Sequence, residues 1–326
     1  MSRVKVFIDV YYYKAALSGI RTYINELTLA ATTHGSENIE YIFSHDINKL
    51  SNNQFYLNSS NQLIRWLFQL NYLIWKQLIL PFKLLLHRPD YLICPDYISP
   101  MFSFNTKKIT VIHDSLFWDY PKNYSSIWRK YFLILINLGI DNKTQVITTS
   151  NYSKKNLLKV IKKTTLIDYI YQSFDNVLDS KNNLESKLQL PESYILHIGS
   201  FEKRKDLITL VKAFHVLKKK ESNNKIKLVL AGAQVVNGNK KMIKQIKRYI
   251  LNNDLENEIV LPNYITKEDA YQYYNNALMY VFPSFDEGFG IPIIESFSYS
   301  LPVICSDTPV FKEIGNDSVS YFKKGD

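Results

Sequence analysis

Two glutamates late in the chain flank a glycine-containing loop, where carboxylates and an anion-binding turn could meet. Glu287 and Glu295 are separated by Gly-Phe-Gly-Ile-Pro-Ile-Ile, so Gly288 and Gly290 lie in the loop and Pro292 lies in the first turn of an expected helix. Glycine allows close backbone approach or a positive φ, and proline suits the start of a helix. A helix N-terminus after such a loop favours bound anions. The alternative interpretation is that Glu295 only complements the helix dipole and that Glu287 faces solvent.

A basic turn follows an expected strand in the second half of the chain. The strand ends at Gly199, and Lys203, Arg204 and Lys205 precede a helix that begins near Asp206. A departing nucleoside diphosphate gains charge as its bond to a sugar breaks, and fixed cations stabilise that charge. Arginine binds phosphate through two N–H groups and lysine supplies a point charge. A solvated basic turn is the alternative.

The first half offers His113, at the end of an expected strand, and Gly19, in the loop that follows the first strand. A single histidine at a strand end is more often structural than catalytic, and its pKa suits either use. Tyr11, Tyr12 and Tyr13 precede Gly19 and suggest either an acceptor-binding surface or aromatic packing of the loop.

Short apolar runs alternate with amphipathic stretches along the whole chain. Nearly continuous apolar runs are typical of parallel strands covered on both faces, so the pattern predicts doubly wound α/β sheets. We expect strands at residues 4–10, 39–43, 91–94, 109–112, 146–149, 194–198, 227–231, 279–282 and 302–305, and helices at 19–30, 153–162, 207–219, 242–251 and 267–276. The polar stretch 173–186 predicts a linker between domains at residues 1–172 and 187–326.

Composition narrows the choice of partners and of compartment. The 326 residues carry a net charge of +10, which favours a polyanionic partner such as nucleic acid, an anionic membrane or a phosphorylated small molecule. Nucleic acid is disfavoured because the basic residues are scattered. Cys94 and Cys305 stand alone in apolar runs and are expected to be buried thiols. The N-terminus lacks the features of a signal peptide and no apolar run is long enough to span a bilayer, so we expect a cytoplasmic protein.

Residues 63–86 predict an amphipathic helix in which basic residues alternate with aromatic ones, until proline breaks the run. One interpretation is that this helix lies on the anionic inner face of the cell membrane. The other is that it packs on the N-terminal sheet. The residues behind both interpretations are Arg65, Trp66, Trp75, Lys76, Pro81 and Lys83.

The segment around the two glutamates resembles the retaining glycosyltransferases of group 1 (family 4), which have the GT-B fold. Their Glu–seven-residue–Glu motif stands here as Glu287 to Glu295, and residues 300–309 also resemble the family. The resemblance implies two Rossmann-like domains facing a cleft. It also implies that Glu295 holds the donor ribose and that Glu287 contacts the transferred sugar. Backbone amides at Phe289, Gly290 and Ile291 would meet the diphosphate.

The same resemblance assigns roles in other segments. Arg204 and Lys205 match the family's phosphate motif, which begins at Gly199. His113 matches a His-Asp pair beside the transferred sugar, and Gly19 remains from a glycine-rich loop that approaches the donor phosphates.

Some positions depart from the family pattern. Arg21 changes the first glycine loop, residues 172–175 replace an Asn-Gly-hydrophobic-Asp motif, and Ser300 replaces a glycine that would serve a left-handed helix end. Family members continue for several helices beyond the place of Asp326, so a protein that ended there would lack part of the second sheet's cover.

The resemblance to this family implies a retaining glycosyltransferase that moves a hexose-type sugar from a nucleotide diphosphate donor to a hydroxyl of a polysaccharide or lipid-linked glycan. No Asp-x-Asp pair and no His/Cys cluster with metal-ligand spacing occurs, so we expect no metal cofactor. The rivals are a catalytically silent glycosyltransferase-like subunit that binds a partner or a membrane, and a different GT-B enzyme such as a nucleotide-sugar epimerase.

Overall fold

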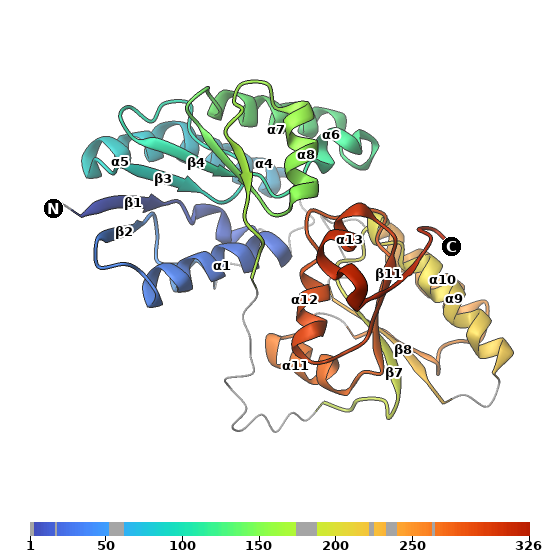
Figure 1. The fold of residues 1–326 in the computed structure, drawn as a ribbon. Coiled ribbons are helices and arrows are strands. Elements are labelled where there is room, and N and C mark those ends of the chain that lie inside the picture. Colours follow the sequence, from blue (N-terminus) through green and yellow to red (C-terminus); the bar gives the residue numbers. More distant parts are fainter. Residues whose placement is uncertain are drawn as a thin grey trace. The chain divides into compact units, whose positions relative to one another are not determined.

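The computed structural model describes residues 3–16, 18–51, 62–173, 188–221, 225–232, 240–262 and 265–326. The chain divides into two compact units, Met1–Ser173 and Phe174–Asp326 (Figure 1). The linker predicted at residues 173–186 lies outside the described residues after Ser173.

The N-terminal unit is built on a parallel sheet with the strand order β2-β1-β3-β4-β5-β6. Phe7 of β1 pairs with Ile42 of β2 on one side and with Leu92 of β3 on the other. Phe7 and Leu92 are fully buried, as expected of strands covered on both faces. The strands are β1 (Val4–Ile8), β2 (Ile39–Phe43), β3 (Tyr91–Cys94), β4 (Lys107–Val111), β5 (Gln145–Thr148) and β6 (Ile167–Tyr169).

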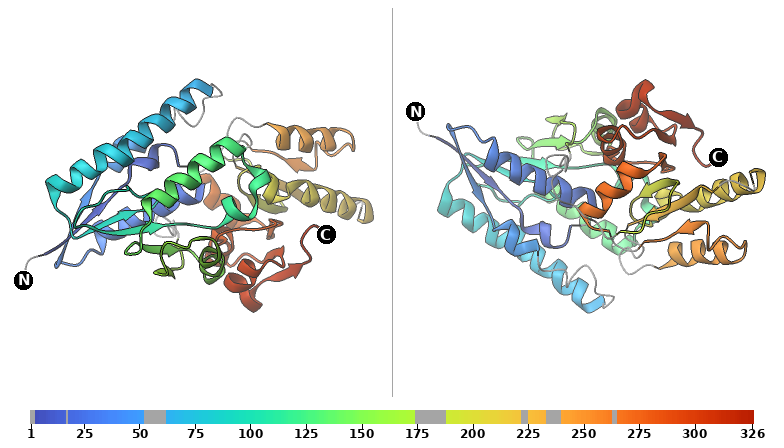
Figure 2. Two further views of the ribbon diagram at one scale, coloured as in Figure 1. Left: turned by 90° about the horizontal axis from the view of Figure 1, so that it is seen from above. Right: turned by 90° about the horizontal axis from the view of Figure 1, so that it is seen from below.

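Helices cover both faces of this sheet (Figures 1 and 2). Residues 62–87 form one continuous rod, in which a π-helical turn joins two α-helices. The helical elements are η1 (Tyr11–Lys14), α1 (Ser18–Thr33), α2 (Ile47–Ser51), α4 (Gln62–Ile74), η2 (Trp75–Ile79), α5 (Leu80–His87), α6 (Leu116–Asp119), η3 (Pro121–Asn123), α7 (Ser126–Gly139) and α8 (Asn151–Val160).

The C-terminal unit repeats the architecture with the parallel order β12-β11-β10-β7-β8-β9. Its strands are β7 (Tyr194–Ile198), β8 (Lys227–Ala231), β9 (Ile259–Val260), β10 (Met279–Phe282), β11 (Val303–Ser306) and β12 (Ser320–Phe322). Its helical elements are η5 (Lys203–Lys205), α9 (Leu207–Lys220), α10 (Lys241–Leu251), α11 (Lys267–Asn276), α12 (Ile291–Ser298), α13 (Pro309–Gly315) and η6 (Asn316–Ser318).

The structure confirms the doubly wound α/β prediction and the burial of Cys94 and Cys305. The prediction that Pro81 breaks the helix is wrong. Pro81 stands in the first turn of α5, directly after the π turn, and the rod continues through it. Proline has no backbone N–H to donate. A helix therefore tolerates it where the regular pattern of backbone hydrogen bonds is already interrupted, as it is after a π turn.

Candidate functional site

The carboxyl ends of β7 and β8 meet at two glycines. Gly199 directly follows β7, and its N–H donates to the carbonyl of Ala231 at 3.0 Å. Gly232 has a φ of +118°, and a Cβ there would lie 2.3 Å from the Gly199 carbonyl oxygen. Only glycine fits this close approach, which keeps side chains out of the turn that leads to the basic segment.

The basic segment forms a single 3₁₀ turn, η5, which contains Arg204 and Lys205 and ends at Asp206 with a left-handed φ of 48°. The N–H of Phe285 donates to the carbonyl of Arg204 at 2.8 Å. This bond joins the turn after β7 to the loop after β10. Two segments far apart in the sequence therefore lie side by side at the carboxyl ends of neighbouring strands, where doubly wound folds bind ligands.

Glu287 contacts both cations of this turn. Arg204 Nη1 lies 2.5 Å from Glu287 Oε2, and Lys205 Nζ lies 2.6 Å from Oε1. Glu202 holds the same guanidinium from the other side, with Oε2 at 2.9 Å from Arg204 Nε. Lys205 also lies over the Phe282 ring, 4.8 Å from its centroid. The structure thus brings together Arg204 and Lys205 from one predicted motif and Glu287 from another.

The charge state of this cluster is well defined. Burial alone would raise the pKa of Glu287, but Arg204 and Lys205 hold it at about 2. Burial lowers the pKa of Lys205, and the Glu287 carboxylate opposes that effect only in part. At neutral pH, Glu287 is therefore an ionised hydrogen-bond acceptor that has no proton to donate.

The loop after Glu287 turns directly into α12. Gly290 is the N-cap of this helix with a φ of +116°, and a Cβ there would lie 3.2 Å from the Phe311 ring. Phe289 is buried, and Ile291 is the first helical residue. The first N–H groups of a helix have no acceptor within it, so the start of α12 at Gly290 and Ile291 has the backbone geometry that favours an anion.

Glu295 lies in α12 and is oriented by α11. The hydroxyl of Tyr274 donates to Glu295 Oε2 at 2.7 Å, and the Tyr274 ring stacks on Tyr299 at 5.3 Å. Burial and then Glu295 raise the pKa of Tyr274 well above its ordinary value, so this phenol remains a donor. Burial raises the pKa of Tyr280 well above its ordinary value, and the nearby charges of Glu295 and Glu287 raise it further. Both glutamates therefore belong to one region of the C-terminal unit.

His113 lies in the N-terminal unit, after β4, and both of its ring nitrogens are engaged. Nε2 lies 2.8 Å from the carbonyl oxygen of Pro95, and Nδ1 lies 3.3 Å from the side-chain nitrogen of Gln172. Its own carbonyl accepts a hydrogen bond from the Thr149 hydroxyl at 2.8 Å. Burial lowers the pKa of His113 to about 4, so the ring is neutral at physiological pH. A neutral imidazole with both nitrogens engaged positions its surroundings and does not act as a proton carrier.

Gly19 lies in the first turn of α1, where an added Cβ would meet nothing within 4 Å. Packing within the described residues therefore gives no reason for glycine. One turn later, Tyr23 packs edge-on against His113, with ring centroids 4.9 Å apart. Arg21 lies over the Tyr13 ring at 4.3 Å, and Tyr11 stacks on Trp75 at 4.7 Å. Tyr11 and Tyr13 therefore pack against other side chains of the N-terminal unit.

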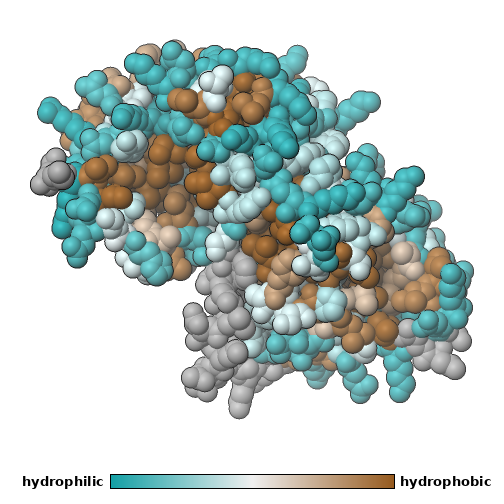
Figure 3. All heavy atoms as spheres, viewed as in Figure 1, coloured by the Kyte–Doolittle hydropathy of each residue, from teal (hydrophilic) through white to brown (hydrophobic). Residues whose placement is uncertain are grey.

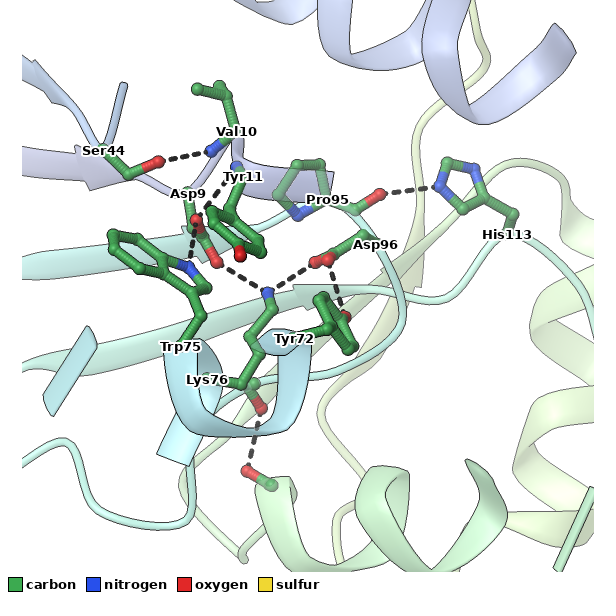
Figure 4. Close-up of polar contacts among 12 residues, drawn as sticks. Asp9, Val10, Tyr11, Ser44, Tyr72, Trp75, Lys76, Pro95, Asp96 and His113 are labelled. Carbon is green, nitrogen blue, oxygen red and sulfur yellow. Dashed lines mark hydrogen bonds and ion pairs between the residues drawn. The ribbon is translucent and has the colours of Figure 1, made fainter. Parts of the chain in front are cut away.

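A buried ion cluster that the sequence interpretation missed lies at the ends of β1 and β3 (Figure 4). Lys76 Nζ lies 2.7 Å from Asp9 Oδ2 and 2.7 Å from Asp96 Oδ1. The Tyr72 hydroxyl donates to Asp96, and the Trp75 indole donates to Asp9. Lys76 is one of the basic residues behind the two interpretations of residues 63–86, and its ammonium is buried in the π turn, as the interpretation with the helix packed on the N-terminal sheet allows. The side chain of Arg65 lies outside the described part of the structure.

The missed residues carried little signal. Asp9 and Asp96 each follow an apolar run, a position that allows but does not require an ion pair. Tyr274 is one of several tyrosines in its helix, with no spacing that distinguishes it. Glu202 directly precedes the basic segment already singled out, where a carboxylate beside three cations could have been noticed.

Comparisons with known proteins support one family. Residues 180–324 match the family model described as glycosyl transferases group 1. The O-antigen chain mannosyltransferase B of Escherichia coli is 26% identical over 223 residues, which cover 65% of this chain and 56% of that protein. The chain thus spans about half the length of the curated relatives that it matches first.

Solved structures show the same two-sheet fold. The sucrose-phosphate synthase of Thermosynechococcus elongatus superposes with a TM-score of 0.71 at 18% identity, over 99% of this chain and 87% of that one. Anabaena HepE, in complex with UDP and glucose, superposes with a TM-score of 0.66 at 15% identity, over 99% and 87%. The fold is therefore the GT-B fold that the sequence resemblance implied.

Proposed function

We propose that the chain, whose residues 180–324 match the family model of the glycosyl transferases of group 1, moves a hexose-type sugar from a nucleotide diphosphate donor to a hydroxyl of a polysaccharide or lipid-linked glycan. The observation that carries this proposal is the convergence of Arg204 and Lys205 on Glu287 beside the Gly290 loop. These parts come from two separate strand ends, and together they suit a diphosphate next to a sugar.

Arg204, Lys205 and the N-terminus of α12 are proposed to bind the donor diphosphate. Glu202 and Glu287 neutralise the two cations in the structure, so an incoming diphosphate shares those cations with the carboxylates. Charge that develops on the leaving phosphate then meets donors that are already in place. No metal ion is required in this scheme, because side chains and backbone N–H groups supply the positive charge.

Glu287 is proposed to accept hydrogen bonds from hydroxyls of the transferred sugar, and Glu295 to accept them from the donor ribose. A carboxylate with a pKa near 2 suits the role of a fixed acceptor and not that of an acid. In a retaining transfer, the acceptor hydroxyl attacks the face that the diphosphate leaves, and its proton passes to the leaving phosphate. His113 is proposed to contact the sugar through its uncharged ring or its main chain.

The names of the relatives support a glycan acceptor. The Escherichia coli relative is named as an O-antigen chain mannosyltransferase, and another relative is named as a Staphylococcus aureus capsular polysaccharide glycosyltransferase. Both names point to surface polysaccharides. A donor that is made in the cytoplasm and an acceptor bound for the cell surface agree with a proposed location at the inner face of the cell membrane.

Slow hydrolysis of the donor tests the proposal without knowledge of the acceptor. A thermal-shift screen against UDP, GDP and ADP first identifies the base, since a ligand of the folded state raises stability. Release of the matching diphosphate from its sugar conjugates is then measured. We expect release to be lost in Arg204→Ala and Glu287→Ala and to persist in Lys203→Ala, whose side chain is exposed in the same turn. If the folded chain neither binds nor releases a nucleotide, it is the catalytically silent subunit instead.

A further inference from the structure

The rod formed by α4, η2 and α5 exposes a continuous row of large apolar side chains along one side. Trp66, Leu70, Ile74, Leu78 and Phe82 follow one another at four-residue intervals, and all are exposed. Leu86 continues the row, with Leu63, Leu67, Ile79 and Leu85 beside it. We call these ten residues the exposed ridge. Its opposite side faces the core, where Phe68, Tyr72, Trp75, Leu80 and Leu84 are buried.

The apolar surface continues beyond the rod. The N–H of Met101 donates to the side chain of Gln77 in η2 at 3.0 Å, which holds the loop after β3 against the rod. Met101, Phe102 and Phe104 of this loop are exposed. The loop reaches α7 through the Ser99 hydroxyl, which donates to the Gly139 carbonyl, and α7 exposes Ile127, Ile134 and Leu138. Figure 2 shows the rod and α7 beside each other.

The segments that form this surface carry basic residues and no acidic ones. Residues 62–89, 99–108 and 121–139 contain lysines and arginines but no aspartate or glutamate. Arg88, Lys107, Lys122 and Lys130 are exposed, and Lys83 is half-buried. The carboxylates next to these ranges in the sequence are Asp90, Asp119 and Asp141. Asp90 accepts from the N–H of Lys5, Asp119 accepts from the Ser115 hydroxyl, and Asp141 pairs with Lys108.

An apolar surface of this extent is unusual on a protein that is surrounded only by water. Apolar residues also reach the surface elsewhere in both units, but between many hydrophilic side chains (Figure 3). Among the described residues, no helix combines the length and the apolar character that a bilayer-spanning segment needs. The exposed ridge is therefore expected to be an interaction site.

We propose that the exposed ridge, together with residues 101–104 and the exposed side of α7, docks on an anionic lipid bilayer. The apolar row enters the boundary between headgroups and acyl chains, and the surrounding lysines and arginines contact anionic headgroups. Exposed aromatic residues such as Trp66, Phe82 and Phe102 suit that boundary. A second copy of the chain fits less well, because the positive rims of two identical surfaces would repel each other. The inference stands whether or not the chain transfers sugar.

Vesicle flotation of the full chain tests this proposal. Vesicles of phosphatidylglycerol and phosphatidylcholine are compared with vesicles of phosphatidylcholine alone. The test variant is Leu78→Glu with Phe82→Glu, at positions that are 66% and 60% exposed. The matched control is Leu251→Glu with Val216→Glu, at positions of the C-terminal unit that are 64% and 52% exposed. Because all four side chains are exposed, thermal unfolding should change little in either variant.

We expect the chain to float with the anionic vesicles and far less with the neutral ones. The ridge variant should lower partition onto anionic vesicles by about a hundredfold, because each apolar side chain that leaves water contributes about tenfold. The control variant should bind as the unmodified chain does. Lys107→Gln with Lys130→Gln should weaken anionic binding and leave neutral binding unchanged.

Two results would overturn the proposal. One is flotation that is absent or equal for the ridge and control variants. The other is a dimer, measured by sedimentation equilibrium without lipid, that Leu78→Glu with Phe82→Glu dissociates, because the surface would then serve a second copy.

Discussion

The substitution Glu287→Gln isolates the charge that holds Arg204 and Lys205. In the folded chain these cations lower the pKa of Glu287 from 4.5 to about 2. A shift of that size corresponds to about 3 kcal/mol of stability at neutral pH, since one pKa unit is worth about 1.4 kcal/mol. The side chain is only 11% exposed, so solvent screening reduces this value little. The substituted amide keeps the shape of the side chain and loses its charge, and we expect the C-terminal unit to lose most of that stability at pH 7.

The sign of the pH dependence follows from the lowered pKa. Stability from an ionised carboxylate is complete above its unfolded pKa and is lost as the pH falls toward the folded one. The difference between wild type and Glu287→Gln should therefore shrink from about 3 kcal/mol at pH 7 to roughly half of that at pH 3.

The distribution of tryptophan provides an internal control for this measurement. Trp66, Trp75, Trp118 and Trp128 all belong to the N-terminal unit. Urea unfolding followed by tryptophan fluorescence reports the N-terminal unit, and it should be the same for the wild type and for Glu287→Gln. Hydrogen exchange of the β10 amides should report the destabilised C-terminal unit. A difference that stays constant between pH 7 and pH 3, or a more stable variant, would refute the assignment of Glu287 as the ionised partner of the two cations.

Three further outcomes are expected. Lys76→Met should cost the N-terminal unit about 3–5 kcal/mol by tryptophan-detected urea unfolding, because Asp9 and Asp96 stay buried without their cation. Adding Asp9→Asn and Asp96→Asn should recover most of that loss, and no recovery would argue against the ion cluster as its cause. Ser300→Gly should stabilise the C-terminal unit by about 1 kcal/mol, since Ser300 has a φ of 52°, and a lower Tm would contradict this. In ¹⁵N NMR spectra, the His113 ring should remain neutral from pH 8 to pH 5, and protonation near pH 6.5 would be incompatible with its burial.

The sequence predicted the interior of the fold better than its edges. The strands at residues 39–43, 91–94, 194–198, 227–231 and 279–282 have the predicted bounds, because continuous apolar runs mark strands covered on both faces. The strands β6, β9 and β12 were missed. They have two or three residues each, so no periodic pattern can distinguish them from loops.

The departure at Ser300 illustrates how local chemistry can be anticipated from one residue. The family pattern has a glycine there, which would serve a left-handed helix end, and Ser300 adopts that conformation itself. Its N–H donates to Phe297, and the N–H of Leu301 donates to Ser296, so the helix end is closed without glycine. By contrast, the pairing of Glu287 with Arg204 depends on the order of β7 and β10 in the sheet, which no single motif contains.

The π turn explains how one rod can serve both the core and the surface. In an α-helix, a row of residues four apart turns by about 40° at each step, so a row from Phe68 to Leu84 would wind nearly halfway around the axis. The wider turn of η2 reverses part of that drift, so the buried row stays toward the sheet and the exposed ridge stays away from it. Lys76 lies in this turn, and its ion pairs with Asp9 and Asp96 fix the turn against β1 and β3. The same buried ammonium therefore holds the strand ends near His113 and sets the direction of the surface proposed to bind lipid. Residues 62–87 could not reveal this by themselves, because both carboxylates that hold Lys76 lie in other segments of the chain.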